Sequence, residues 1–169
     1  MIKMNTLDDL IKEIKKNMDT GNELQNLKYI MNEYKNNDWI EYLSTTQLRQ
    51  QSSREKQYLC KNNDRKIIYQ DDMIDVVLIL WEPNKESGIH DHPKNGCLLK
   101  ILDGELIEEL YSKEKHIKHI ETKEWIKNDC SYIEGDDILH SIKNENKKAS
   151  ISLHIYSPPN YKTKYYSDI

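Results

Sequence analysis

The chain has 169 residues, with 25 Lys and Arg against 29 Asp and Glu, so its formal net charge is −4. This length favours one domain, residues 1–169, with a core that needs no disulfides. The longest uncharged apolar run, residues 76–81, is far too short to span a bilayer. A slightly acidic balance without a block of Lys or Arg argues against a nucleic-acid or membrane-binding surface. These features exclude a membrane protein and favour a soluble one.

The three cysteines, Cys60, Cys97 and Cys130, are widely spaced and include no Cys-x-x-Cys pair. An odd number of cysteines without a close pair fits neither a disulfide framework nor a four-thiolate zinc site. Residues 1–9 contain no apolar segment typical of a secretory signal. We therefore expect a protein of the cytoplasm and, because no extended apolar surface is predicted, a monomer.

The first third of the chain is predicted to be helical. Thr6 and Asp9 resemble a capping box, with Asp in place of the usual Glu. Apolar residues then recur at helical spacing until residues 19–22, which include Gly21, end the run. The polar stretch 47–55 is expected to be a solvated helix or a loop. The expected helices cover residues 7–18, 24–34 and 39–43.

From residue 66 onward the pattern changes to short strands separated by turn residues, which is typical of a sandwich or barrel. Asp103-Gly104 is a hairpin turn signal between two of these strands. We predict a mainly β fold, a cupin-type jelly-roll barrel in residues 63–160 with an N-terminal helical cap in residues 1–55. The expected strands cover residues 67–70, 74–81, 97–102, 105–111, 116–120, 131–134, 139–142 and 151–156.

The sharpest local feature is Ile89-His90-Asp91-His92. On a strand, residues two apart point to the same face, so His90 and His92 can converge on one point inside a barrel while Asp91 points away. One interpretation of this pair is a metal site. The other is two unrelated histidines on a loop.

The residues that follow favour the metal site. Cys97 and then Gly104 resemble the rest of the first cupin motif, with Cys97 where many cupins carry a Glu ligand. Gly135, His140 and Asn144 resemble the second cupin motif, which supplies a further metal-binding His. No carboxylate has an obvious claim to the metal. The implied ligands are His90, His92 and His140.

Three imidazoles give a metal site a particular charge. Two histidines and one carboxylate form the common facial site of non-haem iron oxygenases. A third imidazole in place of the carboxylate leaves a divalent ion with its full double charge, which favours an anionic substrate ligand such as a thiolate. Zinc on three imidazoles, as in a hydrolytic site, is the competing interpretation, and the type of ligand alone does not separate the two.

Longer segments resemble the cysteine dioxygenase family. They are residues 81–92 (WEPNKESGIHDH), 97–106 (CLLKILDGEL) and 152–159 (SLHIYSPP), and residues 30–34 (IMNEY) are also similar, so the likeness covers most of the chain. The resemblance implies an Fe(2+) enzyme that uses O2 to oxidise the thiol of L-cysteine to cysteine sulfinate. The substrate supplies the electrons, so no 2-oxoglutarate or nicotinamide is needed. The family's three iron ligands match His90, His92 and His140.

The resemblance also assigns roles beside the metal. The family's arginine that binds the substrate carboxylate matches Arg65, and a planar guanidinium suits that role because it forms two parallel hydrogen bonds. Taken alone, Arg65 would be a surface residue at the start of a strand. Relatives often carry a Tyr two residues earlier, where this chain has Asn63, and the family's Cys shortly after Ser157-Pro158-Pro159 is missing, which indicates a differently built pocket edge.

In animal members of the family a Cys and a Tyr beside the iron are joined by a thioether, and Cys97 and Tyr156 match both. We expect this crosslink, with Tyr156 facing substrate and oxygen; the alternative is that Cys97 is a small buried strand residue and that Tyr156 merely packs. Ser152, His154 and Tyr156 alternate on one strand, and the resemblance implies a hydrogen-bonded chain through them that orients the Tyr hydroxyl. His154 is then a supporting residue and not a fourth ligand. Trp81 is expected to close the core beside the site.

Two other functions stay open. A related dioxygenase acts on 3-mercaptopropionate, but a Gln marks those relatives at the arginine position, so Arg65 favours cysteine. The second is a non-enzymatic metal-binding cupin, against which three intact histidines argue. His116 and His119 are expected to be solvated.

Overall fold

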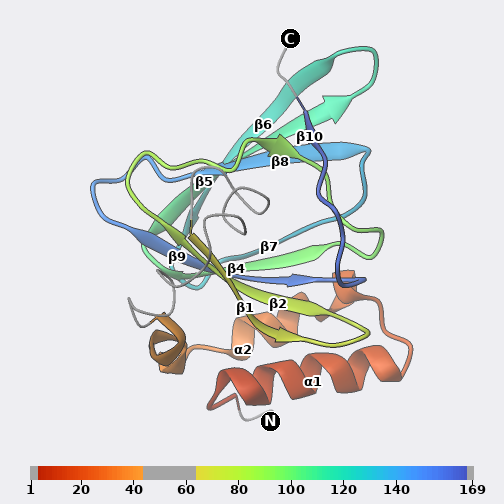
Figure 1. Ribbon diagram of the computed structural model, residues 1–169, viewed down its shortest axis with the longest axis vertical. Helices are drawn as coiled ribbons and strands as arrows, with labels where there is room; N and C mark the ends of the chain where they lie inside the picture. The colour runs from red at the N-terminus through yellow and green to blue at the C-terminus, as the bar shows by residue number, and fades with distance from the viewer. Residues whose placement is uncertain (1–3, 44–63, 167–169) are drawn as a thin grey trace.

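The computed structural model describes residues 4–43 and 64–166, and Figure 1 shows two β-sheets with a helical segment lying against one of them. The expected element 47–55, Cys60 and Asn63 lie outside the described residues. No helix within the described ranges has both the length and the apolar character needed to cross a membrane. The mainly β fold with small N-terminal helices confirms the predicted fold class.

The first helix, α1 (Leu7–Asp19), begins at the predicted capping box. The Oγ1 atom of Thr6 accepts a hydrogen bond from the Asp9 amide (3.0 Å), and the Asp9 carboxylate accepts one from the Thr6 amide (3.1 Å). A further acceptor comes from outside the helix, because Asp38 Oδ2 lies 2.8 Å from the Leu7 amide. That contact ties the start of α1 to the end of the helical segment.

The prediction of one continuous helix over residues 24–34 is wrong in detail. A 3₁₀ turn, η1 (Leu24–Leu27), precedes a short α2 (Lys28–Glu33), and a second 3₁₀ segment, η2 (Asp38–Leu43), replaces the third helix. Leu24 and Leu27 are both buried, and the three-residue period of a 3₁₀ turn aligns them on one side.

In the described ranges, ten strands form two five-stranded antiparallel sheets. Sheet A has the order β1 (Asp64–Gln70), β2 (Asp75–Trp81), β9 (Ser150–Tyr156), β4 (Cys97–Asp103), β7 (Cys130–Ile133). Sheet B has the order β10 (Tyr165–Tyr166), β3 (Ile89–His90), β8 (Ile138–Lys143), β5 (Glu105–Lys113), β6 (Ile117–Ile126).

Sheet A is buried on both faces. One face packs on the helices through residues such as Val76, Leu78 and Leu153, in a cluster that also contains Leu10 and Ile30. The opposite face meets sheet B in a second cluster, whose members are Val77, Ile79, Trp81, Leu99, Ile101, Leu106 and Ile142. The near-continuous apolar run of β2 follows from this double burial, because neighbouring residues point to opposite faces.

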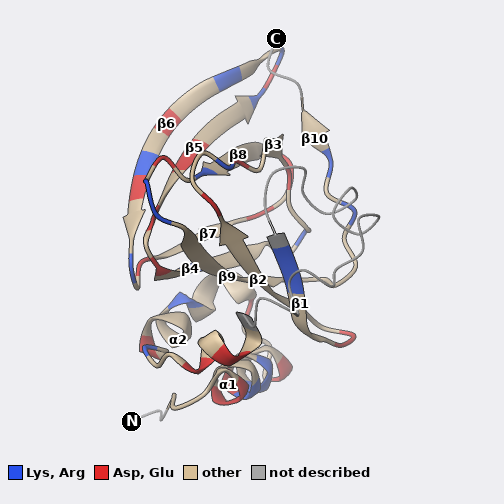
Figure 2. Ribbon diagram, turned by 60° about the vertical axis from the view of Figure 1, so that its left-hand side comes forward, with Lys and Arg blue, Asp and Glu red and all other residues tan. Residues whose placement is uncertain are grey.

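Two strand predictions need correction. Asp103-Gly104 is not a hairpin turn, since β4 and β5 belong to different sheets, and Gly104 (φ +77°) instead takes the chain from one sheet to the other. A Cβ at Gly104 would lie 3.0 Å from the Cα of Ser150, so the corner also requires the missing side chain. Strand β6 runs to Ile126 and not to residue 120, pairing with β5 along its length, and Figure 2 shows basic and acidic positions along this exposed strand.

Candidate metal centre

Three histidine side chains meet between the sheets. The Nε2 atom of His140 lies 2.8 Å from that of His92 and 3.1 Å from that of His90. Two nitrogens bound to one ion at about 2.1 Å, at right angles to each other, are about 3.0 Å apart. These three residues are the group that could hold a metal ion among the described residues, and their donor set fits a divalent cation.

The reason for this convergence differs from the one expected. Strand β3 ends at His90, so His92 lies in the loop beyond it, and the prediction that one strand presents both rings is wrong. His90 pairs with His140 across β3 and β8, which sets those two rings side by side. The His92 amide donates to the Gly135 carbonyl (2.9 Å), and this bond fixes the loop that brings the third ring in.

Burial lowers the pKa of two of these rings, His90 and His92. Burial, together with the neighbouring His140, lowers the pKa of His90 to about 3. The same causes, burial first and then His140 and His90, lower the pKa of His92 well below its ordinary value. Their Nε2 atoms face the same point as that of His140, and a neutral ring can offer a lone pair there, which a metal ion requires.

A buried carboxylate stands behind one of these rings, and the sequence analysis missed it. Glu108 Oε2 accepts a hydrogen bond from His140 Nδ1 (2.6 Å), and its Oε1 accepts from Trp125 Nε1 and from the Ser131 hydroxyl (3.0 Å each). Burial alone would raise the pKa of Glu108. The hydrogen bonds that it accepts, of which the bond from His140 has the largest effect, hold the pKa below its usual value. The available signal was its place on β5, two residues after the buried Leu106 and therefore on the inward face.

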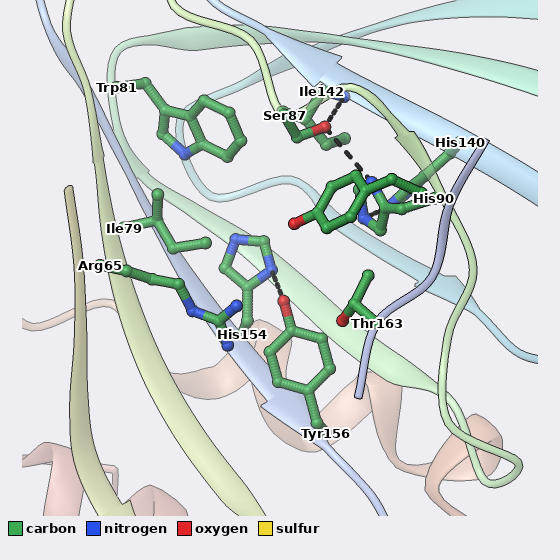
Figure 3. Close-up of a pocket in the computed structure, with 11 residues that line it drawn as sticks. Arg65, Ile79, Trp81, Ser87, His90, His140, Ile142, His154, Tyr156 and Thr163 are labelled. Carbon is green, nitrogen blue, oxygen red and sulfur yellow. Dashed lines mark hydrogen bonds between the residues drawn. The ribbon is translucent and has the colours of Figure 1, made fainter. Parts of the chain in front are cut away.

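Strand β9 carries a chain of polar side chains, of which Figure 3 shows His154 and Tyr156. Trp81 Nε1 donates to Ser152 Oγ (2.8 Å), Ser152 Oγ shares a hydrogen bond with His154 Nε2 (2.7 Å), and His154 Nδ1 lies 3.3 Å from the Tyr156 hydroxyl. Burial and then the charge of Arg65 lower the pKa of His154 well below its ordinary value. His154 lies outside the group of three rings that could hold a metal.

Arg65 and Tyr156 line the same pocket as His90 and His140. The guanidinium carbon of Arg65 lies 5.5 Å from the centre of the Tyr156 ring, within the range of a cation–π contact. The structure therefore places a fixed positive charge on the wall opposite the imidazoles (Figure 3). Such a charge suits an anionic ligand in the pocket.

Cys97 is buried beside this arrangement. It is the direct partner of Tyr156 in the pairing of β4 and β9, and its sulfur lies 3.8 Å from His154 Nδ1. Burial raises the pKa of the Cys97 thiol far above its ordinary value, so the sulfur is protonated. Cys97 and Tyr156 are thus neighbours on one face of sheet A.

The pocket edge comes from the segment after Ser157, and the sequence did not predict how. Thr163 and Tyr165 line the pocket, and the Tyr165 ring lies 5.6 Å from that of His90. Asp91 holds this segment, since its carboxylate accepts hydrogen bonds from the Lys164 amide (2.9 Å) and the Tyr166 hydroxyl (3.2 Å). Asp91 does point away from the metal site, and it supports the pocket wall beside His90 that Thr163 and Tyr165 form.

Other singled-out residues lie apart from the imidazoles. The side-chain amide of Asn144 is buried and donates to the Trp81 carbonyl (2.8 Å), so it anchors the loop after β8. His119 is half exposed and lies 2.9 Å from the Thr122 hydroxyl, and His116 is exposed. Trp81 is buried where expected.

The two sheets contribute different parts of the site. His90 and His140 belong to sheet B, and His92 follows β3 of that sheet. Sheet A contributes Arg65, Trp81, Cys97, Ser152, His154 and Tyr156, while Ile142 on β8 and Tyr165 on β10 add pocket wall from sheet B.

Solved structures with the same architecture support the cupin assignment. The chain superposes on an oxalate decarboxylase of Bacillus subtilis with a TM-score of 0.54 and 17% identity, over 70% of this chain and 31% of the other. For an oxalate decarboxylase of Lactobacillus farciminis the TM-score is 0.51, with 17% identity over 62% of this chain and 31% of the other. The chain thus spans under a third of these proteins, and at this identity the likeness shows the fold alone.

Sequence relatives are more specific. The chain is 30% identical to cysteine dioxygenase type 1 of Bos taurus, over 94% of this chain and 78% of the relative. It is 29% identical to that of Homo sapiens and 26% identical to that of Danio rerio, with the same coverage. The family Cysteine dioxygenase type I matches residues 1–169. Together with three converging imidazoles, this match confirms the predicted family: the chain belongs to the cysteine dioxygenase type I family of thiol dioxygenases.

Proposed function

We propose that this chain binds Fe(2+) through His90, His92 and His140 and uses O2 to oxidise the thiol of L-cysteine to cysteine sulfinate. The observation that carries the proposal is a three-imidazole group and a guanidinium on facing walls of one pocket. Iron held by these three histidines would supply the redox chemistry for the oxidation of the thiolate by O2. The side chains of the protein bind the substrate and orient it for the reaction.

Arg65 is the proposed anchor for the substrate carboxylate. Its guanidinium shares the pocket with His90 and His140, so one small molecule can reach both the arginine and the imidazoles. Two parallel hydrogen bonds between guanidinium and carboxylate fix the orientation of the amino acid as well as its position. The thiolate then faces the metal site, which is the geometry that a reaction at sulfur needs.

Tyr156 is proposed to position the reacting groups. Its hydroxyl is hydrogen-bonded to His154, whose other nitrogen is held by Ser152, and Trp81 holds that serine in turn. A buried chain of this kind leaves the hydroxyl one preferred direction. The ring of Tyr156, stacked on the positive Arg65, also shields the guanidinium from water.

Cys97 and Tyr156 are proposed to form a thioether, supported by their direct pairing across β4 and β9. The step joins Cys97 Sγ to a ring carbon of Tyr156 and removes one hydrogen from sulfur and one from the ring, with O2 as the acceptor. The crosslink fixes the tyrosine ring for the main reaction.

We also propose that the protein is a cytoplasmic monomer and that its binding partners are cysteine and O2. Cys97 and Cys130 are both free thiols, as expected in a reducing compartment. The large apolar side chains that are exposed come from elements as separate as α2 (Tyr29) and β6 (Ile120). Light scattering of the purified protein tests the monomer, and a dimer would overturn it.

The deciding experiment is O2 uptake by the Fe(2+)-loaded protein with L-cysteine, and with 3-mercaptopropionate and cysteamine in parallel. Uptake with cysteine, matched one-to-one by cysteine sulfinate, is the expected result. Uptake with 3-mercaptopropionate alone would keep the metal site and overturn the substrate. Lack of uptake with every thiol, despite bound iron, would leave a non-enzymatic metal-binding cupin.

A further inference from the structure

Glu108 is the most deeply buried carboxylate near the imidazoles, with 2% of its side chain exposed. Its three hydrogen-bond donors come from three different strands, namely His140 on β8, Trp125 on β6 and Ser131 on β7. An indole N–H can only donate, so Oε1 accepts from Trp125, and a His140 ring that offers its Nε2 lone pair to a metal carries its proton on Nδ1 and donates it to Oε2. The carboxylate is therefore fully satisfied without carrying a proton.

Burying a charge in this way is costly unless an opposite charge lies near. None of the three donors is a Lys or an Arg, so hydrogen bonds alone do not balance the negative charge. The point where the three Nε2 atoms converge lies just across the His140 ring. A divalent cation there supplies the missing positive charge through one imidazole.

The other two rings have different supports. His90 Nδ1 lies 2.8 Å from the Gly88 carbonyl, which is a neutral acceptor, and His92 Nδ1 makes no hydrogen bond within the described residues. Only His140 among the three is backed by a carboxylate in that part of the chain. The negative charge of the site is thus concentrated behind a single ligand.

We propose that Glu108 serves as the carboxylate of the metal centre, acting through His140 instead of binding the metal directly. It is a positioning residue: it holds His140 in the tautomer with the proton on Nδ1, aims Nε2 at the metal and makes the ring a stronger donor. The inference rests on the proposed three-histidine metal site. It also changes the charge expected from three imidazoles, because the centre and its outer carboxylate together carry one positive charge less.

The replacement Glu108→Gln tests this role, because it keeps the shape and removes the charge. Chelator competition on the full-length protein should give dissociation constants for Fe(2+) and Zn(2+) about 10- to 100-fold weaker than those of the unmodified protein. The Fe(3+)/Fe(2+) midpoint potential should move to more positive values, since loss of a nearby negative charge favours the ferrous state. Unchanged affinities and an unchanged potential would overturn the proposal.

Glu108 also joins the two sheets, because it accepts a hydrogen bond from Ser131 on β7. If this link were its only role, loss of the link alone would weaken metal binding as much as loss of the charge. Two controls separate these roles. Ser131→Ala removes the bond to sheet A and keeps the charge, and Asp71→Asn removes a carboxylate of a remote ion pair to Lys15. Both should lower the melting temperature and leave metal affinity within about twofold. Equal weakening of metal binding in Ser131→Ala and Glu108→Gln would show that Glu108 acts only as a link between the sheets.

The unmodified protein provides a check that does not depend on any variant. In the diamagnetic Zn(2+)-loaded form, ¹⁵N-resolved proton spectra should show His140 with a downfield Nδ1–H resonance, as expected for a 2.6 Å bond to a carboxylate. A proton on Nε2 would overturn the proposal. These readouts need no turnover, so failure of the dioxygenase activity and failure of the Glu108 role are distinguishable.

Discussion

Cys97 and Tyr156 face each other as paired residues of β4 and β9, and both approach the same atom. The Cys97 sulfur lies 3.8 Å, and the Tyr156 hydroxyl 3.3 Å, from Nδ1 of His154. We expect turnover with cysteine and O2 to produce a thioether between them. Peptide mass spectrometry should then find the two peptides joined, with the loss of two hydrogen atoms. Cys130→Ser should form the crosslink and Cys97→Ser should not, and separate, unmodified peptides after many turnovers would contradict the expectation.

Arg65→Ala should weaken substrate binding selectively. Hydrogen bonds to charged groups contribute about 1.5–3 kcal/mol each, so the KM for cysteine should rise roughly tenfold or more. Cysteamine has the thiol and the amine but no carboxylate, so its slower oxidation should be equally slow in the variant and in the unmodified protein. Steady-state O2 uptake with both thiols measures the difference. A KM for cysteine that does not change would remove Arg65 from the substrate site.

Ser152→Ala should lower kcat by roughly 10- to 100-fold with little change in KM, because it frees the Tyr156 hydroxyl from its preferred direction. The serine lies between the Trp81 indole and His154, at 2.8 and 2.7 Å. Ser150→Ala on the same strand is the matched control. Its hydroxyl bonds to the backbone of Glu105, so this variant should lose stability and keep its kcat. Equal losses of kcat in the two variants would argue against an orienting chain.

Asp71→Asn should destabilise the protein in a pH-dependent way. Burial would raise the pKa of Asp71, but hydrogen bonds from Lys15 and Tyr69 depress it far below its ordinary value. A carboxyl group with a depressed pKa stabilises the fold above its unfolded-state pKa, about 3.9, and that contribution is lost as the pH falls.

Melting curves from pH 7 to pH 3 test this sign. The variant should melt a few degrees below the unmodified protein at pH 7, and the gap should start to narrow below about pH 4. Lys12→Ala removes an exposed pair with Asp8 on the same helix and should leave the melting temperature nearly unchanged. A gap that widens at low pH would contradict the assigned direction of the shift.

The sequence predicted those parts of the fold whose signals are local and repeated. The capping box at Thr6, the apolar strand β2 and the alternation of Ser152 and His154 each depend on spacing within a few residues. Strands β3 and β10 have two residues each, which is too short for any periodicity to show. The Asp103-Gly104 signal identified a turn but not the change of sheet, because turn chemistry does not specify which strands pair afterwards.

The candidate site divides in the same way. The histidines were recognisable from their motif, although His92 reaches the others from a loop and not from a strand. Glu108 has no motif, and its role depends on partners from β6, β7 and β8 that only the folded barrel brings together. The place of Tyr165 in the pocket could not be predicted from the sequence either, because Asp91 holds the neighbouring Lys164, which lies 73 residues further along the chain. Long-range placement of polar groups is the information that local patterns lack.

The division of the site between two sheets makes it modular. The proposed metal ligands lie on or beside sheet B and the proposed substrate anchor, Arg65, lies on sheet A, so a designer can alter one without rebuilding the other. What couples them is the apolar layer between the sheets, where Val77, Ile79 and Leu99 act as a spacer. Its thickness sets the span between the arginine and the imidazoles. A thicker layer would therefore select thiols with a longer carbon chain between sulfur and carboxylate.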